Sequence, residues 1–359
     1  MHFSVAAWHA PVPEGSATGR ILRALCDGLQ DIGHTLDVSV WGEGAAGHSD
    51  TTDLPAWCTW QPLPRRTSWR MHARALTRPR TEVALAGWAP REGAVALADE
   101  PQSFAAVESA PRSCVVVHFA ARLDGKALGV RTAQHVQDLR HDRHVARRAD
   151  LLLAYSDRVA AAVGHAATPV PVAFPVPAQP VAAIGVPIVA MLADWSWAPN
   201  RVALGVLLRG WPEVRDAVPG AELVVAGRGD PGIGTLPGVR VVGEVASSAE
   251  LLAGAAVLAF PCPPTSGPKV KVLEAMALGV PVVTTPAGVE GLLVPGDAAF
   301  VSDEKDFVTT LIAALRDPGR RATYARDAHA AVARHHAPAA AATAWAEVVR
   351  RRWPELDGS

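Results

Sequence analysis

The first half of the chain alternates between short apolar runs and apolar residues at helical spacing. Phe3–Trp8 is an apolar run, a Pro/Gly-rich loop follows at 11–19, and Ile21–Ile32 then carries apolar residues at helical intervals. Gly33 suits the left-handed residue that ends a helix, and Leu36–Trp41 predicts the next strand. Because a strand, a helix and a strand follow in order, the pattern predicts a parallel, doubly wound sheet.

Later apolar runs complete this first predicted sheet. They lie at Ala94–Ala98, Cys114–Val117 and Leu151–Ala154, with a charged helix predicted at 132–149 between the last two. Residues 42–80 mix tryptophan, proline and arginine in a pattern typical of neither helix nor strand, so no element is predicted there.

A dense run of prolines divides the chain. Neither a helix nor a central strand accepts this density, and we interpret 169–187 as an interdomain linker. The strand and helix rhythm restarts after it, which predicts a second doubly wound domain. Its predicted strands are Ile188–Leu192, Glu222–Ala226, Val239–Val242, Val257–Phe260 and Val280–Thr284, and its predicted helices are Arg201–Val218, Ala249–Ala253, Lys271–Leu278 and Lys305–Arg316.

The predicted fold class is therefore α/β, with Rossmann-like domains at 1–168 and 188–335. The carboxyl ends of both sheets are expected to face a shared cleft, where α/β sheets bind ligands. An Ala/Arg-rich tail is divided by Pro338, and its last helix, within 336–359, can cross back to the first domain.

Composition narrows the class of protein. With 34 Lys plus Arg against 35 Asp plus Glu, the chain lacks a basic excess, and no nucleic-acid partner is expected. A hydrophobic share of 49% with 19% charged residues excludes disorder for most of the chain. The longest apolar runs are far shorter than the roughly 18 residues of a membrane span, so a soluble cytoplasmic protein is expected. The scattered cysteines, Cys26, Cys58, Cys114 and Cys262, indicate no disulfide framework, zinc site or redox pair.

The strongest candidate chemistry follows the predicted strand Val257–Phe260. A Gly/Pro-rich loop leads into a helix that begins near Lys269, and two of the chain's four lysines, Lys269 and Lys271, fall in this turn. Free N–H groups at a helix start attract phosphate, and a lysine adds a full charge. Glu274, about one turn further on, can accept hydrogen bonds from both hydroxyls of a ribose. The pattern indicates a nucleoside diphosphate site without a metal; the simpler alternative is a polar loop with solvated lysines and a glutamate favoured by its early helix position.

Here the chain becomes similar to a known family. Pro264–Gly279, followed by Val280–Gly291, closely resembles the nucleotide-sugar site of the family 4 glycosyltransferases, which are retaining enzymes of the GT-B fold among the glycosyl transferases group 1. Many members carry two glutamates separated by seven residues; here Ser266 stands at the first position and Glu274 at the second. Further matching segments are Trp197–Asn200, Val224–Gly229, Pro237–Gly243, Gly15–Arg20, Gly33–His34 and Ala149–Ser156.

The resemblance implies a role for each matching residue in the second domain. Glu274 binds the ribose, Lys269 neutralises the leaving diphosphate as a catalytic residue, and Arg228 is a second diphosphate contact. Charge from such a basic pair means that no metal or other cofactor is required beyond the UDP- or GDP-sugar. The implied diphosphate-binding backbone is that of Ser266, Gly267 and Pro268, and the implied base-facing turn is Gly243, Glu244 and Val245.

The first domain offers fewer candidates. His118 follows the strand Cys114–Val117, where the family often has a polar residue near the transferred sugar; the alternative is a histidine hydrogen-bonded at a strand end. Asp99 and Glu100 end another strand and can hold acceptor hydroxyls, with a solvated loop as the alternative. Two substrate-binding positions in the glycine-rich loop come from the resemblance, Gly15 and Ser16.

Two other groups of residues are given structural interpretations. Asp138 and His141 have a spacing that can mimic metal ligands, but the arginines among them indicate a solvated helical face, and no metal is expected. The tryptophans from Trp57 to Trp88 are interpreted as core or interface residues rather than as an acceptor-stacking surface.

The sequence thus predicts a retaining, metal-independent hexosyltransferase that uses a nucleoside-diphosphate sugar and a hydroxyl of a small-molecule or lipid-linked acceptor. One alternative is a nucleotide-sugar epimerase on the same fold, which needs acid and base carboxylates beside the sugar. Another is a non-catalytic nucleotide-sugar-binding protein. The scarcity of lysine suggests a high-GC genome and is compatible with bacterial natural-product or cell-envelope glycan biosynthesis.

Overall fold

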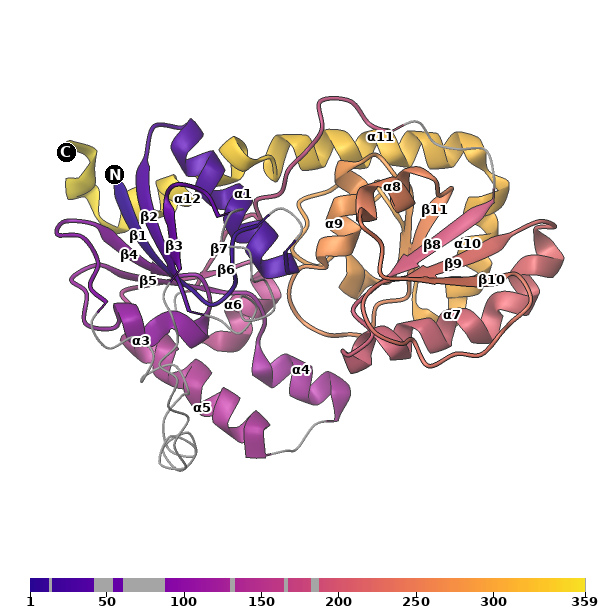
Figure 1. The fold of residues 1–359 in the computed structure, drawn as a ribbon, viewed down its shortest axis with the longest axis horizontal. Helices are drawn as coiled ribbons and strands as arrows, with labels where there is room; N and C mark the ends of the chain where they lie inside the picture. The colour runs from indigo at the N-terminus through magenta and orange to yellow at the C-terminus, as the bar shows by residue number, and fades with distance from the viewer. Residues whose placement is uncertain are drawn as a thin grey trace. The chain divides into compact units, whose positions relative to one another are not determined.

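The computed structural model forms two compact units (Figure 1). Unit 1 comprises Met1–Ala173 and Ala337–Ser359, and unit 2 comprises Phe174–His336. The proline-rich segment interpreted as a linker is therefore shared by both units. The structure describes residues 1–12, 15–41, 54–60, 88–129, 133–164, 167–181 and 187–358.

The sheet of unit 1 is parallel and doubly wound. Its strands are β1 (His2–Ala7), β2 (Thr35–Val40), β3 (Cys58–Trp60), β4 (Val95–Ala98), β5 (Ser113–Val117), β6 (Leu151–Ala154) and β7 (Thr168–Pro169), in the order β3-β2-β1-β4-β5-β6-β7. Ala98 pairs with Ala6 of β1 and with Val115 of β5. The carboxyl ends of β1, β4 and β5 therefore meet at one edge of the sheet.

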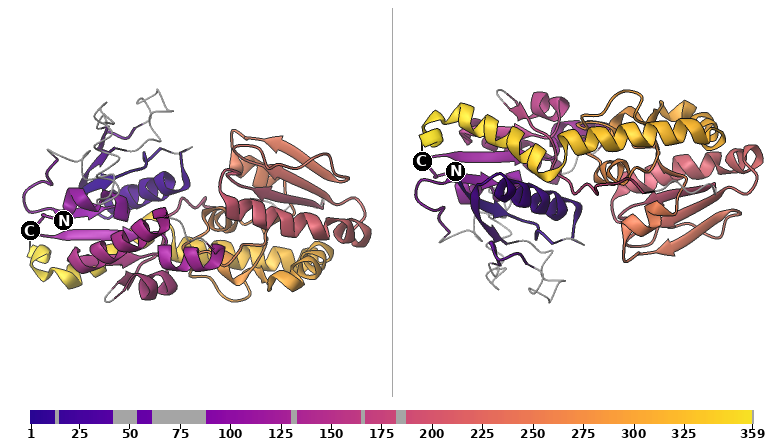
Figure 2. Two further views of the ribbon diagram at one scale, coloured as in Figure 1. Left: turned by 90° about the horizontal axis from the view of Figure 1, so that it is seen from below. Right: turned by 90° about the horizontal axis from the view of Figure 1, so that it is seen from above.

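Amphipathic helices cover this sheet. They are α1 (Ala17–Asp31), α3 (Phe104–Val107), α4 (Ala121–Leu128), α5 (Ala133–Arg148), α6 (Asp157–Val163) and α12 (Pro338–Arg352), with short 3-10 helices at Pro101–Ser103 and Pro354–Gly358. α1 buries Leu22, Leu25 and Leu29, as the apolar spacing predicts. α12 lies alongside α1 (Figure 2), and a side chain at Gly28 would meet the carbonyl of Pro338 at 2.1 Å. The C-terminal helix thus returns to the first domain, as predicted.

Unit 2 repeats the architecture with a second parallel sheet. Its strands are β8 (Ile188–Leu192), β9 (Glu222–Ala226), β10 (Val239–Gly243), β11 (Val257–Phe260), β12 (Val282–Thr284) and β13 (Phe300–Val301), in the order β10-β9-β8-β11-β12-β13. Its helices are α7 (Ala198–Ala217), α8 (Ser248–Ala253), α9 (Val270–Ala277), α10 (Phe307–Arg316) and α11 (Pro318–His335), with 3-10 helices at Pro286–Gly288 and Glu304–Asp306. α7 packs against α10, and α9 packs against α11 (Figure 1).

The proline-rich segment is buried over its first part, at 170–174. Pro169 lies in the edge strand β7, where a residue without an N–H is tolerated. Val170 donates its N–H to the carbonyl of Ala154, and Val172 and Phe174 are buried. The described prolines lie outside any helix or central strand, as predicted. The segment is buried at 170–174 and exposed at 175 and 177–180.

Of the tryptophans between Trp57 and Trp88, Trp88 packs against the first sheet. Trp88 donates its indole N–H to Ser39 Oγ at 3.1 Å and meets the ring of Trp41 edge-on, with centroids 5.8 Å apart. Trp69 lies outside the described residues. None of the described helices is long and apolar enough to cross a membrane.

Candidate functional site

The loop between β11 and α9 in unit 2 is fixed from several sides. Thr284 Oγ1 donates to the carbonyl of Phe260, and Thr285 Oγ1 donates to that of Cys262, each at 2.6 Å. Gly267 has a positive φ of 76°, which favours glycine, and donates its N–H to Glu290 Oε1 at 3.2 Å. The loop therefore delivers the chain in a defined path to Lys269, the N-cap residue of α9.

Lys269 turns its side chain back on the loop that precedes it. Its Nζ donates to the carbonyl oxygens of Gly267 at 2.5 Å, Ser266 at 2.9 Å and Thr265 at 3.4 Å. The residue is 5% exposed, so the alternative of a solvated lysine is wrong. Lys269 braces the loop that the sequence predicts to bind a diphosphate.

Lys271 lies one residue into the first turn of α9 and faces α7. Its Nζ donates to Asn200 Oδ1 at 2.8 Å and lies 4.1 Å from the ring centroid of Phe260. Burial lowers the pKa of Lys271 to about 7, even though Cys262 and Asp194 act in the opposite direction. Lys271 was not among the predicted site residues, although its membership of a rare lysine pair marked it for attention.

Glu274 is held by the neighbouring helix α8. It is 4% exposed, and its Oε1 accepts a hydrogen bond of 2.7 Å from the hydroxyl of Ser248. Ser248 is the first residue of α8, and the preceding Ser247 accepts the N–H of Glu250 as the N-cap. The carboxylate therefore has a fixed direction, which a bidentate contact to two vicinal hydroxyls requires.

Two glycine turns of unit 2 lie beside each other. Gly227 donates its N–H to the carbonyl of Gly243 at 2.7 Å, which joins the predicted turns 227–229 and 243–245. Gly227 has a φ of 126°, and a side chain there would meet the carbonyl oxygen of Ala193 at 1.8 Å. Only glycine fits this crossing of β9 and the segment after β8.

Arg228 projects from this turn and is exposed. It pairs with Asp194, and this hydrogen bond raises the pKa of the guanidinium. Asn200 in turn donates its amide to the carbonyl of Asp194 at 2.7 Å. Arg228, Asp194, Asn200 and Lys271 are thus connected, while Glu244 is exposed and Val245 half-buried.

The predicted residues of unit 1 form a buried cluster at the carboxyl edge of its sheet. His118 is 2% exposed, and its Nε2 lies 2.7 Å from the carbonyl oxygen of Asp99 and 3.6 Å from Asp99 Oδ1. His9 Nε2 lies 3.5 Å from Glu100 Oε2. Asp99 is 0% and Glu100 4% exposed, so the alternative of a solvated loop is wrong here too. The ring of Tyr155 meets His118 edge-on at 4.8 Å.

Burial and mutual charge shift the titration of this cluster. Burial raises the pKa of Glu100 to about 7, against the favourable charge of His118. Burial alone would lower the pKa of His118, but hydrogen bonding and charge from Asp99 outweigh it and raise the pKa. The cluster can therefore hold a proton near neutral pH, a property common at sites of proton transfer.

Gly15 and Ser16 stand at the start of α1. Ser16 is the N-cap residue, and its Oγ accepts the N–H of Gly19 at 3.1 Å. Gly19 approaches the carbonyl of Ala10 so closely that a side chain would lie 2.1 Å from it. The glycine-rich loop thus has a structural reason for its composition, and substrate binding by Gly15 and Ser16 stays a prediction.

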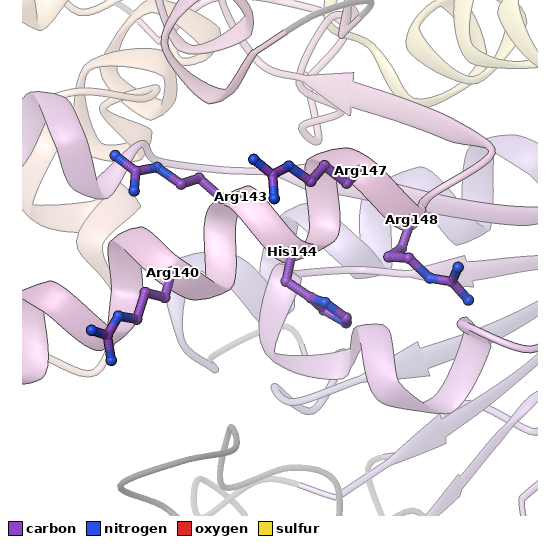
Figure 3. Close-up of a pocket in the computed structure, with 5 residues that line it drawn as sticks. All are labelled: Arg140, Arg143, His144, Arg147 and Arg148. Carbon is purple, nitrogen blue, oxygen red and sulfur yellow. The ribbon is translucent and has the colours of Figure 1, made fainter.

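The charged helix α5 presents its arginines to solvent. Figure 3 shows Arg140, Arg143, His144, Arg147 and Arg148 projecting from the helix around a shallow pocket. On other sides of the helix, His141 Nε2 lies 2.7 Å from the carbonyl of Pro101, and Asp142 accepts the N–H of Ala121 at 3.2 Å. Among the described residues, no three His, Cys, Asp or Glu side chains are grouped to hold a metal ion. The interpretation of a solvated helical face is confirmed for these five residues.

Comparison with known proteins gives a family match within the second unit. Residues 186–317 match the model of the family described as glycosyl transferases group 1. Unit 2 thus contains a segment similar to the group 1 glycosyltransferases. The matched range contains the α9 loop, both glycine turns, Lys271 and Glu274. The match confirms, over this range, the resemblance to the glycosyl transferases group 1 that the sequence motifs suggest.

Solved structures resemble the whole chain. Sucrose-phosphate synthase from Thermosynechococcus elongatus has 16% identity and a TM-score of 0.75, with 100% of both chains covered. TarM has 8% identity and a TM-score of 0.72, covering 97% of this chain and 98% of that one. HepE from Anabaena, in complex with UDP and glucose, has 16% identity and a TM-score of 0.68, covering 97% and 99%. These likenesses confirm the predicted GT-B fold. A comparison with curated protein sequences gives no match.

Proposed function

We propose that this protein is a retaining glycosyltransferase that moves a hexosyl group from a UDP- or GDP-sugar to a hydroxyl of a small-molecule or lipid-linked acceptor. The observation that carries the proposal is the start of α9. There a braced loop, the buried Lys269, the half-buried Lys271 and a fixed buried carboxylate lie within eight residues of chain, from Gly267 to Glu274. This combination suits a diphosphate followed by a ribose.

The donor nucleotide is assigned to unit 2. The Ser266–Lys269 loop and the positive end of α9 bind the diphosphate, and Glu274 accepts hydrogen bonds from the ribose hydroxyls. The turn at Gly243–Val245 faces the base, since its contact with Gly227 places it beside the same connected set of residues. Arg228 is exposed and can exchange its pairing with Asp194 for a phosphate oxygen.

Positive charge at the α9 loop serves the chemical step. Departure of the nucleoside diphosphate builds negative charge on the leaving oxygen while the sugar gains oxocarbenium character. Fixed N–H groups and lysine charge stabilise that leaving group more in the transition state than in the bound donor. We therefore propose that no metal or other cofactor is needed.

His118 is the catalytic candidate of unit 1, which we propose to bind the acceptor. The carboxylate of Asp99 faces this imidazole and favours its protonated form, so Asp99 is assigned as a positioning residue for His118. We propose that Asp99 acts through His118 rather than as the direct acceptor ligand that the sequence suggests, because its carboxylate lies against the imidazole.

A panel of UDP- and GDP-sugars with the wild-type protein tests the proposed function. Release of free nucleoside diphosphate, with retention of the anomeric configuration in the product by NMR, is the expected result. Epimerised donor would indicate the epimerase alternative, and binding without turnover would indicate a non-catalytic protein. Hydrogen exchange with bound UDP or GDP should protect 227–229, 243–245 and 266–274; protection confined to residues 1–165 contradicts the site assignment.

A further inference from the structure

The two lysines at the start of α9 have different surroundings. An ammonium group has three N–H donors. Those of Lys269 are directed at three carbonyl oxygens of its own loop, those of Thr265, Ser266 and Gly267. Lys269 cannot donate to a phosphate without giving up a contact that fixes the loop.

Lys271 keeps donors to offer. In the described part of the chain, Asn200 Oδ1 is the oxygen to which its Nζ donates, and the ring of Phe260 lies on another side of the ammonium. At least one N–H group therefore remains for a further acceptor. The nearby carboxylate of Asp194 is engaged by Arg228 and Ser196.

The electrostatic surroundings of Lys271 favour an anion. Lys271 is in the first turn of α9, and Asn200 is in the first turn of α7, so the ammonium lies at the positive ends of two helices. The charge of Lys269 adds to this effect. A cation in such a place is disfavoured, whereas an anion bound beside it interacts favourably with both helix ends and with the ammonium.

We propose that Lys271, rather than Lys269, is the side chain that binds the diphosphate of the donor, while Lys269 holds the loop in shape. This inference rests on the proposed function and refines its diphosphate site. Because burial lowers the pKa of Lys271 to about 7, most of the population is neutral in the free protein at pH 8. Binding of a diphosphate protonates it, so nucleotide binding at pH 8 takes up protons.

Calorimetric titration with UDP, GDP and the corresponding nucleosides tests this assignment. Lys271→Met should lower the affinity for the preferred diphosphate by roughly 10- to 100-fold, the loss of one charge-assisted contact. It should leave nucleoside affinity unchanged. Lys271→Arg should retain most diphosphate affinity. Wild-type binding heats at pH 8 should depend on the ionisation enthalpy of the buffer, and those of Lys271→Arg should depend on it less, because arginine stays protonated.

Asn200→Ala is the matched control, because it tests whether Lys271 acts only through its hydrogen bond between α9 and α7. It removes the same hydrogen bond between α9 and α7 but keeps the ammonium, so diphosphate affinity should fall far less than in Lys271→Met. Equal losses in the two variants, or unchanged diphosphate affinity in Lys271→Met, overturn the inference while leaving the proposed function intact. A wild-type protein that binds neither UDP nor GDP overturns the proposed function and this inference together.

Discussion

Ser248 donates its hydroxyl to Glu274 Oε1 at 2.7 Å, which joins the first residue of α8 to the buried face of α9. This hydrogen bond fixes the orientation of the Glu274 carboxylate, which would otherwise rotate about its side-chain bonds. If this carboxylate binds a ribose, a substitution of Glu274 can separate its recognition of the ribose hydroxyls from its role in packing α9 against α8.

Glu274→Gln should raise the donor KM clearly while the fold is kept. Gln and Glu have similar helix propensity, and the amide can still accept the Ser248 hydroxyl but is a poorer acceptor for two ribose hydroxyls. Steady-state kinetics with a ribose donor and its 2′-deoxy analogue checks this. The wild type should disfavour the deoxy donor, and the variant should hardly distinguish the two. Discrimination that survives intact in the variant, with a lowered melting temperature, would assign Glu274 to helix packing alone.

Lys269→Ala should lower both the melting temperature and donor turnover. It leaves three loop carbonyls without their shared donor, and loss of such buried contacts costs on the order of 1–3 kcal/mol. Lys305→Ala is the control, because Lys305 is exposed and lies in the 3-10 helix before α10. Thermal unfolding and nucleotide release measured on both variants test whether Lys269 stabilises the loop before α9. Equal behaviour of the two variants would contradict this role.

Stability should fall as pH rises from about 4.5 to about 7 because of Glu100. Its folded pKa of about 7 exceeds the ordinary value of 4.5, so the folded state binds the extra proton in that window, and its stabilising effect is lost as the proton leaves. The change is about 3 kcal/mol at most. His9, whose pKa burial lowers, acts in the opposite direction. Urea unfolding of wild type and Glu100→Gln across this range isolates the Glu100 contribution, and the variant should show the shallower decline; parallel curves would refute it.

Gly227→Ala should destabilise unit 2 by more than about 2 kcal/mol. The positive φ strains any side chain, and the new Cβ would overlap the carbonyl of Ala193. Gly205→Ala is the matched control, because Gly205 lies within α7 and its Cβ would meet only Arg209 Nη1 at 3.5 Å. Alanine there should stabilise by up to about 1 kcal/mol. Denaturant unfolding of both variants gives the comparison, and similar values would show that the crossing at Gly227 can relax.

Removal of divalent metal should leave glycosyl transfer intact. The charge that stabilises the leaving diphosphate is assigned to lysine and to the start of α9, so a metal has no place in the proposed step. Nucleotide release in the presence of EDTA, compared with added Mg²⁺ or Mn²⁺, checks this. A strict requirement for either ion would contradict the proposed mechanism.

The sequence by itself determined much of the second unit. The predicted bounds of β8, β9 and β11 agree with the structure, because fully buried parallel strands are continuous apolar runs ended by turn residues. The start of α9 was also predictable, since a Gly/Pro loop before a helical pattern is a local signal. Short elements without such a pattern, such as α4, α6 and β7, were not predicted, because tertiary packing rather than local spacing selects them.

Only the tertiary structure decided which charged residues act together. Lys271 and Asn200 are 71 positions apart, and Glu274 and Ser248 are 26 apart, so their contacts depend on the order of strands in the sheet rather than on spacing along the chain. The burial of Asp99 could likewise not be predicted from the sequence, because an aspartate after a strand is usually exposed to solvent. The residue types and their positions in turns, which the sequence gives, indicate which groups are candidates for nucleotide binding. Contacts of α9 with α7 and α8 set the hydrogen bonds of Lys271 and Glu274 and lower the pKa of Lys271, because these depend on neighbours that are distant in the sequence.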